Sequence, residues 1–440
     1  MRNVFFIFGA TGDLASRKLF PALFKLFKKG YSFDVLGTGR RFKFEKEFKA
    51  SLVGYDDDFL SHVRFVNMDF SDYDSDSMTS VLSDFGDDSI NVMYYLSLSP
   101  EFYSDAISAI KDINSSCRHI EKKSVIVEKP FGYDLKSAEK YDSVIKGIFS
   151  EDEIFRVDHY LGKEFVQNIL LFRFFNDIIQ GIWNKQFIDH IQIIIDESLG
   201  VDKRISLYEK LGSLKDIVQN HMLQVVSLLT MGEPVSFDSK DISYEKLKVL
   251  RSVRPVRDAV FGRYKSLDNP KVHTMAAMKF YVDNFNFSDV PIYVRTGKKF
   301  PEKKSIIYIK FRDFKGSFAR ASGSKENALM IEIQPNMKID FVLNVKDPSS
   351  QFQTREARLN YDHEKTFGIN TPEAYEQILE RVIKSDKSIF PSIDEILESW
   401  RIIDPISENF DAFGFEVYED NTVPKILSEF IEKDNRKWIV

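Results

Sequence analysis

FFIFGATGDLASRKLF, residues 5–20, is the stretch that decides how this chain folds. It passes from an apolar strand pattern through a glycine turn into a helical pattern, which is the context that a dinucleotide fingerprint requires. The spacing is G-x-x-G-x-x-A, formed by Gly9, Gly12 and Ala15. The first glycine permits a tight turn, the second lets backbone N–H groups approach a pyrophosphate, and the alanine lets the helix pack closely on the strand. The stretch therefore predicts a dinucleotide site, and the alternative is a glycine-rich turn that binds nothing.

The residues around this stretch repeat the alternation of strand and helix up to about residue 150. Apolar strand patterns occupy 4–8, 33–39, 91–97 and 124–132. A helical pattern follows the first strand and is expected to stop at Gly30. This rhythm predicts a doubly wound parallel sheet, an α/β Rossmann domain.

The pattern changes after about residue 157. Helix-like segments occupy 163–180 and 213–231, and β-rich runs occupy 190–197, 305–311, 327–335 and 337–345. Short turns join several of these runs, so we expect a larger α+β domain with a mostly antiparallel sheet. The acidic segment DYDSDS, 72–77, is expected to be a solvated loop.

Composition excludes several classes of partner. The formal net charge of −6 argues against a nucleic acid or an anionic membrane surface as the main partner, because proteins that bind either of these usually carry an excess of basic residues. The single cysteine, Cys117, forms no internal disulfide, and no Cys/His cluster has zinc spacing, so no metal site is expected. The apolar run 4–8 is too short for a signal peptide, and no run approaches the roughly 18 apolar residues of a membrane span. We expect a cytoplasmic protein.

The second strand pattern ends in GTGRR. Rossmann sites that select NAD usually end this strand with an acid that binds the ribose 2′-hydroxyl. Arg40 and Arg41 stand there instead, and guanidinium groups suit the 2′-phosphate of NADP. NADP is the predicted cofactor, with NAD as a weaker alternative; a solvated basic loop is the interpretation without a ligand. Lys18 is a further cofactor candidate or an exposed lysine.

The segment EIFRVDHYLGKE, 153–164, resembles the glucose-6-phosphate dehydrogenases. Four other stretches agree, in the family's order: GATGDLA (9–15), EKPFG (128–132), DIVQNHMLQ (216–224) and VPIYVRTGKK (290–299). Shorter echoes at 334–336 and 399–406 extend the likeness over nearly the whole chain. The resemblance implies an NADP-binding Rossmann domain at 1–157 and an α+β domain for substrate binding and dimerisation at 158–440.

The activity implied by the resemblance is oxidation of the C1 hydroxyl of glucose 6-phosphate by NADP⁺ to 6-phosphogluconolactone, the first step of the oxidative pentose phosphate pathway. The resemblance places the general base at His221 and its supporting carboxylate at Asp158. The chemistry agrees, because a neutral imidazole accepts a proton near pH 7 and a carboxylate stabilises the imidazolium. From the residues alone, a hydrogen-bonded core histidine is the other interpretation of His221.

The resemblance assigns the remaining candidates to substrate and cofactor. The 6-phosphate is expected at His159, Tyr160 and Lys163, with positive charge added by Lys298 and by Lys303, where the family often has arginine. The sugar is expected at Lys129, Glu197, Asp216 and Gln334, although DESLG surrounds Glu197 where the family commonly has KEPFG. The cofactor is expected at Gly9, Ala10, Thr11, Gly12, Asp13, Leu14, Lys18, Arg40, Arg41 and Lys129. The family carries the bond from Lys129 to Pro130 in the cis form.

Two other functions fit parts of the pattern. One is a sugar oxidoreductase of the glucose-fructose oxidoreductase type, which also has an EKP motif but needs no phosphate-binding HYLGK stretch. The other is a catalytically silent NADP-binding regulator, against which intact Asp158, Lys163 and His221 argue. The resemblance also implies a homodimer or a tetramer assembled through the large sheet, with glucose 6-phosphate as the small-molecule partner.

Overall fold

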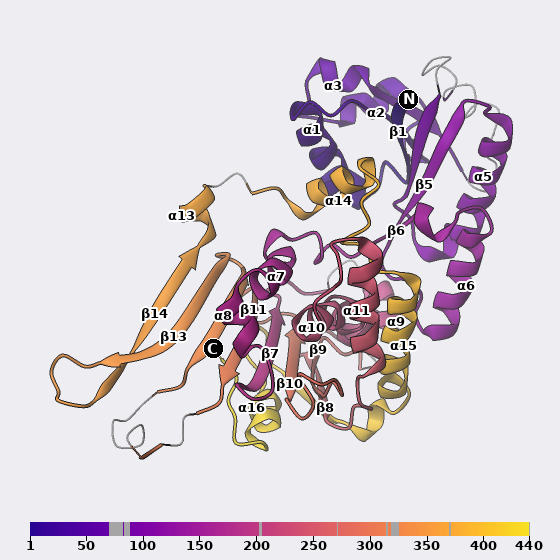
Figure 1. The fold of residues 1–440 in the computed structure, drawn as a ribbon. Helices are drawn as coiled ribbons and strands as arrows, with labels where there is room; N and C mark the ends of the chain where they lie inside the picture. Colours follow the sequence, from indigo (N-terminus) through magenta and orange to yellow (C-terminus); the bar gives the residue numbers. More distant parts are fainter. Residues whose placement is uncertain are drawn as a thin grey trace. The chain divides into compact units, whose positions relative to one another are not determined.

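The computed structural model of the 440-residue chain describes residues 1–69, 82, 89–201, 205–270, 272–313, 316–317, 325–368 and 371–439. The expected solvated loop at 72–77 lies outside these residues. The chain forms two compact units (Figure 1). The first contains Met1–Lys163, Phe237–Ser243 and Pro372–Leu397, and the second contains Glu164–Ser236, Tyr244–Thr371 and Glu398–Val440. The functional division at residues 157 and 158 stays a prediction.

The first unit is built on a six-stranded, all-parallel sheet of order β3-β2-β1-β4-β5-β6. Its strands are β1 (Arg2–Phe8), β2 (Asp34–Gly39), β3 (Val63–Asn67), β4 (Ile90–Leu96), β5 (Ile120–Glu128) and β6 (Ile154–Val157). In β1 every residue from Val4 to Phe8 is buried, because a parallel sheet is covered on both faces. The expected doubly wound sheet is confirmed.

Helices connect these strands. They are the π-helical segment η1 (Ala15–Leu19), α1 (Phe20–Lys28), α2 (Glu45–Ser51), α3 (Asp57–Ser61), η2 (Pro100–Phe102), α5 (Tyr103–Ser116), α6 (Leu135–Lys146) and η3 (Glu151–Glu153). Figure 1 shows α5 and α6 side by side along the sheet, with α1 on its other side. Helix α1 ends two residues before Gly30, whose φ of 92° stops the helix as the sequence predicts.

A helix from far along the chain completes the first unit. Helix α14 (Ala374–Ile383) packs on α1. The carboxylate of Glu376, only 3% exposed, lies 2.8 Å from Nζ of Lys25 and 3.1 Å from Nζ of Lys29. The hydroxyl of Tyr31 donates to Glu380 at 2.7 Å. These contacts join α14 to the helix that follows the glycine turn. The predicted boundary between residues 157 and 158 assigns this segment to the second domain instead.

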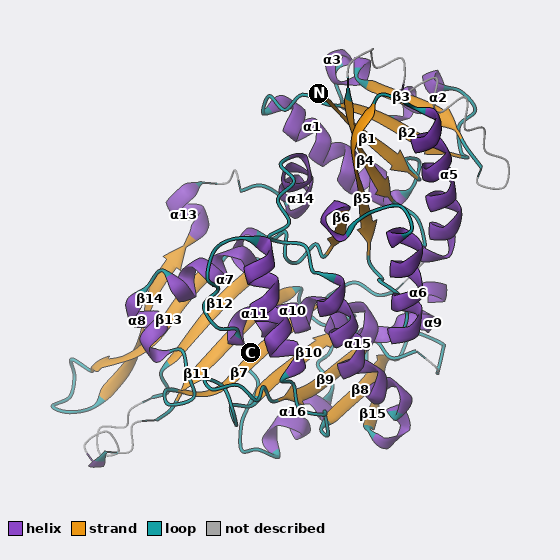
Figure 2. Cartoon of the chain, turned by 45° about the vertical axis from the view of Figure 1, so that its right-hand side comes forward, coloured by secondary structure: helices purple, strands orange, loops and turns teal. Residues whose placement is uncertain are grey.

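The second unit contains a nine-stranded sheet of order β14-β13-β12-β11-β7-β10-β9-β8-β15 (Figure 2). Its strands are β7 (Ile188–Asp196), β8 (Ala259–Tyr264), β9 (Met275–Phe280), β10 (Ile292–Gly297), β11 (Lys304–Phe311), β12 (Ala328–Gln334), β13 (Lys338–Lys346), β14 (Thr354–Asp362) and β15 (Gly414–Tyr418). Of the strand pairs in the described residues, only β7–β10 and β8–β15 are parallel. The expected mostly antiparallel sheet is confirmed.

The helices of the second unit are α7 (Glu164–Phe174), α8 (Asp177–Ile182), α9 (Ile205–Ser213), the π-helical segment η5 (Leu214–Met222), α10 (Leu223–Thr230), α13 (His363–Phe367), η6 (Phe410–Ala412) and α16 (Lys425–Glu432). Helices α11 (Ser239–Arg251) and α15 (Ile393–Glu408) begin in the first unit and end in the second. Residues 217–230 are buried without interruption, so η5 and α10 form a core helix. Among the described residues, no helix combines the length and apolar character that crossing a membrane requires.

We predict that Glu376→Ala lowers the free energy of unfolding by about 1–2 kcal/mol, because it removes the acceptor shared by Lys25 and Lys29 and opens the first turn of α14. Chemical denaturation followed by circular dichroism measures the change. The matched control is Glu139→Ala, on the exposed face of α6, which should shift the value by less than about 0.5 kcal/mol. Equal shifts for the two variants would contradict the structural role of Glu376.

Candidate functional site

The ends of the parallel strands bring distant residues together in the first unit. The register aligns the last strand residues: Phe8 lies opposite Thr38 and Leu96, Leu96 opposite Val127, and Glu128 opposite Val157. Ligands of open α/β sheets bind outside this carboxyl edge. The predicted residues that follow these ends therefore share one edge, and they are Gly9, Arg40, Lys129 and Asp158.

The glycine turn lies between the ends of β2 and β4. Gly9 has a φ of 79°, and a Cβ built on it would lie 2.4 Å from the carbonyl oxygen of Ser97. The backbone N–H of Ala10 donates to the carbonyl of Thr38 at 2.8 Å, and that of Gly12 donates to Gly9 at 2.9 Å. The chain then enters η1, whose first residue, Ala15, is fully buried. The expected tight turn is confirmed, and a turn with no side chain at its apex fits a dinucleotide pyrophosphate.

Three of the cations expected to contact the cofactor, Lys18, Arg40 and Arg41, are exposed. Arg40, with a side chain 72% exposed, follows the last residue of β2, and its guanidinium lies 3.7 Å from the carboxylate of Asp69. Arg41 is also exposed. The Nζ atom of Lys18 lies 3.7 Å from the carboxylate of Glu373, beside the start of α14. The two arginines thus occupy the position from which Rossmann folds read the ribose.

The HYLGK stretch forms a tight turn after β6. The backbone N–H of Tyr160 donates to Oδ1 of Asp158 at 2.9 Å, and that of Leu161 donates to the Asp158 carbonyl at 3.0 Å. The Lys163 ammonium lies 3.5 Å from the centre of the Tyr160 ring, and the His159 ring meets that ring edge-on at 5.5 Å. The turn thus brings a carboxylate, an imidazole, a phenol and an ammonium together within one short segment.

Glu128, for which the sequence predicts no role, lies inside the first unit next to Lys129. Its carboxylate accepts hydrogen bonds from the hydroxyls of Tyr95 and Tyr375, and its backbone carbonyl accepts one from Tyr103. Burial raises the pKa of Glu128 to about 7, although the two tyrosine hydroxyls on its carboxylate lower it. The signal in the sequence is its place in EKPFG, directly before a predicted ligand-binding lysine.

The second unit gathers its predicted residues at one end of the large sheet. Asp196, the last residue of β7, lies opposite Gly297 at the end of β10 and opposite Lys304 at the start of β11. Ser305 lies opposite Gln334 at the end of β12. The residues that end or adjoin these strands are therefore neighbours along one sheet end, and they are Glu197, Lys298, Lys303 and Gln334.

Lys298 is the buried cation of this group, with a side chain 4% exposed. Its ammonium forms an ion pair with Glu197, lies 3.7 Å from the carboxylate of Asp216, and lies 5.2 Å from the centre of the Tyr208 ring. Two carboxylates around one ammonium lessen the cost of burying its charge. Lys303, by contrast, is exposed.

His221 lies in η5, which also carries Asp216. Its side chain is fully buried, and its backbone N–H donates to Oδ1 of Asn220 at 2.8 Å. The helix expected at 213–231 is confirmed, but its first half is a π-helix, a form that often occurs at functional sites. Asp158 belongs to the first unit and His221 to the second, so their pairing stays a prediction.

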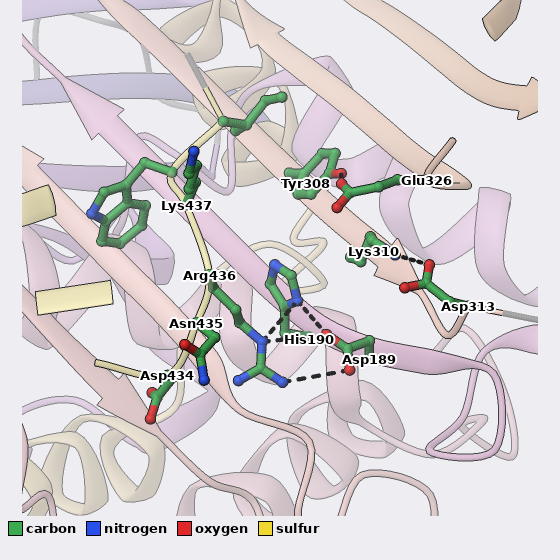
Figure 3. A pocket seen from close by; sticks show the side chains of 12 residues that line it. Asp189, His190, Tyr308, Lys310, Asp313, Glu326, Asp434, Asn435, Arg436 and Lys437 are labelled. Carbon is green, nitrogen blue, oxygen red and sulfur yellow. Dashed lines mark hydrogen bonds and ion pairs between the residues drawn. The ribbon is translucent and has the colours of Figure 1, made fainter. Parts of the chain in front are cut away.

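A cavity of about 600 Å³ lies in the second unit where the C-terminal tail meets the sheet (Figure 3). The Arg436 guanidinium lies 3.3 Å from the carboxylate of Asp189, and Lys310 forms an ion pair with Asp313. Its lining contains none of the predicted site residues. The C-terminal tail, which lines one side of this cavity, is held by Gln192, whose side chain donates to the carbonyl of Lys437 at 2.8 Å.

Proteins of known function are similar to this chain in sequence and in structure. The family model described as "Glucose-6-phosphate dehydrogenase, NAD binding domain" matches residues 6–168, and the one described as "Glucose-6-phosphate dehydrogenase, C-terminal domain" matches 170–439. A glucose-6-phosphate 1-dehydrogenase of Borreliella burgdorferi is 36% identical over 98% of this chain and 96% of its own length. One of Bacillus subtilis is 35% identical over 99% and 98%. The solved structure "Glucose-6-phosphate dehydrogenase in complex with its substrate glucose-6-phosphate" superposes with a TM-score of 0.88 at 32% identity, covering 100% of this chain and 99% of that one.

We predict that Gly9→Ala weakens NADP⁺ binding more than tenfold in calorimetric titration. The alanine Cβ would clash with the Ser97 carbonyl oxygen, and the φ of 79° is unfavourable for alanine, so the turn must move away from the place expected to receive the pyrophosphate. Gly54→Ala is the matched control, because Gly54 has a φ of 93° and open space around it. That variant should lose stability but keep its affinity for NADP⁺. Unchanged affinity in Gly9→Ala would show that the turn does not hold the dinucleotide.

Proposed function

The chain belongs to the glucose-6-phosphate dehydrogenase family, and from this premise we propose that it oxidises glucose 6-phosphate at C1 with NADP⁺ as its preferred acceptor. It is an oxidoreductase that acts on the CH–OH group of glucose 6-phosphate, giving 6-phosphogluconolactone in the first step of the oxidative pentose phosphate pathway. The observation that carries the proposal is the grouping of the family's functional residue types at one sheet end in each unit.

The cofactor is assigned to the carboxyl edge of the first sheet. NADP⁺, when bound, supplies the acceptor for the hydride that leaves C1. The backbone of residues 9–14 binds the pyrophosphate, since the turn is tight and the helical segment η1 follows it directly. Arg40 and Arg41 bind the 2′-phosphate, and their exposure leaves both guanidinium groups accessible to it. NAD⁺ lacks that phosphate and is the weaker substrate.

The 6-phosphate is assigned to the turn after β6. Lys163 supplies a permanent positive charge, His159 an imidazole, and Tyr160 a hydroxyl donor. Their grouping within one turn supports this role. Lys298 and Lys303 add charge from the second unit's sheet end. A site that offers these groups to a phosphate favours glucose 6-phosphate over unphosphorylated sugars. It therefore favours the proposed activity over that of a glucose-fructose oxidoreductase.

Proton removal is assigned to His221. Its neutral imidazole accepts the proton of the C1 hydroxyl, and the Asp158 carboxylate stabilises the imidazolium that forms. Complete burial of the histidine supports the role, because exclusion of water strengthens the electrostatic contribution of a carboxylate. The sugar hydroxyls are assigned to Lys129, Glu197, Asp216 and Gln334. Glu197 and Asp216 already share the Lys298 ammonium, which keeps both carboxylates in place.

Location and assembly complete the proposal. We assign the protein to the cytoplasm, because its one cysteine, Cys117, is buried and unable to form an internal disulfide. We also propose a homodimer or tetramer assembled through the nine-stranded sheet, as the family resemblance implies. Neither assignment affects the chemistry assigned to the two sheet ends.

We predict that His221→Asn lowers kcat by about 10²–10⁴-fold with little change in KM for glucose 6-phosphate, because the base is lost and the substrate contacts remain. Initial rates of NADPH formation measure both constants. His363→Asn is the control, since His363 is a buried histidine of the same unit that bonds to Tyr361 and Thr371. Near-normal turnover in His221→Asn would remove this histidine from the role of base.

We predict that replacing Arg40 and Arg41 together with alanine raises the Kd for NADP⁺ more than tenfold and leaves the Kd for NAD⁺ nearly unchanged. Each charge-assisted hydrogen bond to the 2′-phosphate contributes about 1.5–3 kcal/mol, and NAD⁺ makes none. Fluorescence titration with both nucleotides measures the two constants. Lys46→Ala, an exposed cation on the neighbouring helix α2, serves as the control. Equal losses for both nucleotides would refute the selectivity.

A further inference from the structure

Glu128 is a buried acid at the ligand-binding edge of the first unit to which no role has yet been assigned. It is the last residue of β5 and directly precedes Lys129, and it is 8% exposed. Buried acids are uncommon unless they are paired or hydrogen-bonded. The hydrogen bonds and charges around Glu128 therefore indicate its role at this position.

Hydroxyl groups from separate elements converge on this residue. Oε1 of the carboxylate accepts from Tyr95, at the penultimate position of β4, at 2.5 Å, and from Tyr375, in the first turn of α14, at 3.2 Å. The backbone carbonyl accepts from Tyr103, the first residue of α5, at 3.0 Å. The end of β5 is thus held through both its side chain and its main chain.

The segment that follows Lys129 is also held. Gly132 has a φ of 91°, and a Cβ built on it would lie 2.6 Å from the backbone nitrogen of Ala138 in α6. The chain therefore passes close against α6 three residues after Lys129. Lys129 stands between this packed glycine and the hydrogen-bonded Glu128, so its main chain has two anchors.

Two charged groups act on the Glu128 carboxylate besides the tyrosines. The ammonium of Lys129 favours its ionised form, and the carboxylate of Asp158, which follows β6, opposes it. Burial is the largest influence and raises the pKa of Glu128 to about 7, while the hydroxyls of Tyr95 and Tyr375 lower it. The group consequently changes charge near neutral pH beside a lysine assigned to substrate and cofactor.

We propose that Glu128 is a positioning residue for Lys129: its hydrogen-bonded carboxylate fixes the end of β5, and its negative charge holds the lysine ammonium at the ligand-binding edge. Helix α14 takes part, because Tyr375 is one of the two donors to the carboxylate and Glu376, the next residue, joins that helix to α1. The inference rests on the proposed function, in which Lys129 contacts the reacting molecules.

The experiment compares Glu128→Gln and Glu128→Leu at pH 8. Glutamine keeps an acceptor oxygen for the two tyrosines but carries no charge, whereas leucine has neither. We expect kcat/KM for glucose 6-phosphate, per folded molecule, to fall about tenfold in the glutamine variant and about a hundredfold in the leucine variant, because a misplacement of about 1 Å in a group that contacts the reacting molecules can cost about 10²-fold. Glu395→Gln is the control, a fully buried glutamate of the same unit that accepts from Ser243 and Ser392.

Stability separates positioning from a merely structural role. The folded-state pKa of Glu128 lies above its ordinary value, so the wild type loses stability as the pH rises through about 7, and glutamine does not. At pH 8 the glutamine variant should therefore melt no lower than the wild type while being less active. Wild-type kcat/KM in that variant would overturn the inference.

The pH profile gives a second test. Below pH 7 the wild-type carboxyl is protonated and resembles glutamine, so the ratio of wild-type to Glu128→Gln kcat/KM should approach one. The ratio should rise between pH 6 and pH 8 as the carboxyl ionises. A flat ratio across this range would show that the charge of Glu128 does not act on Lys129.

A measurement without turnover distinguishes failure of this inference from failure of the proposed function. Without the neighbouring carboxylate the Lys129 amine should be held less firmly and should react more readily, so Lys129 should be reductively methylated faster in Glu128→Gln than in the wild type at pH 8. Peptide mass spectrometry measures the rate at that residue. Equal rates would overturn the inference even in an active enzyme. Faster methylation in a protein that does not oxidise glucose 6-phosphate would uphold it while the proposed function fails.

Discussion

The parallel register of β1 with β2 and β4 is the constraint on which the rest of the structure depends. Together with the parallel pairing of β4 with β5, it ends the strands at one level, so the glycine turn, the arginine pair and Lys129 share one edge although about 120 residues separate the first from the last. The turn tolerates no side chain at Gly9, because the Ser97 carbonyl occupies the space. Backbone geometry thus forms the dinucleotide site of the proposed function, to which the arginine side chains are proposed to add selection for the 2′-phosphate.

Individual cationic side chains are held by specific neighbours in this chain, although its formal net charge is −6. An acidic protein that binds phosphorylated molecules needs cations concentrated where the phosphates lie. Lys163 stacks on Tyr160 in the turn after β6, and Lys298 is held by Glu197 and Asp216 in the second unit. These partners keep each ammonium in place, while the exposed arginines after β2 remain accessible to a mobile ligand.

The sequence predicted the features that depend on neighbouring residues. The strand–turn–helix at 5–20, the stop at Gly30 and the helix around His221 follow from spacing and backbone preference, and the structure confirms them. It did not predict the π-helical form of η5 or the hydrogen bond from Tyr375 to Glu128. Those residues are 247 positions apart, and only tertiary packing of α14 brings them together. The pairing of Asp158 with His221 stays a prediction because it joins two units.

The central claim is tested most directly by the initial rate of absorbance increase at 340 nm with purified protein, comparing glucose 6-phosphate with glucose and NADP⁺ with NAD⁺. The account predicts rapid NADPH formation with glucose 6-phosphate, much slower oxidation of glucose, and a lower kcat/KM with NAD⁺. Equal rates with glucose and glucose 6-phosphate, or no rate with either sugar despite NADP⁺ binding, would contradict it.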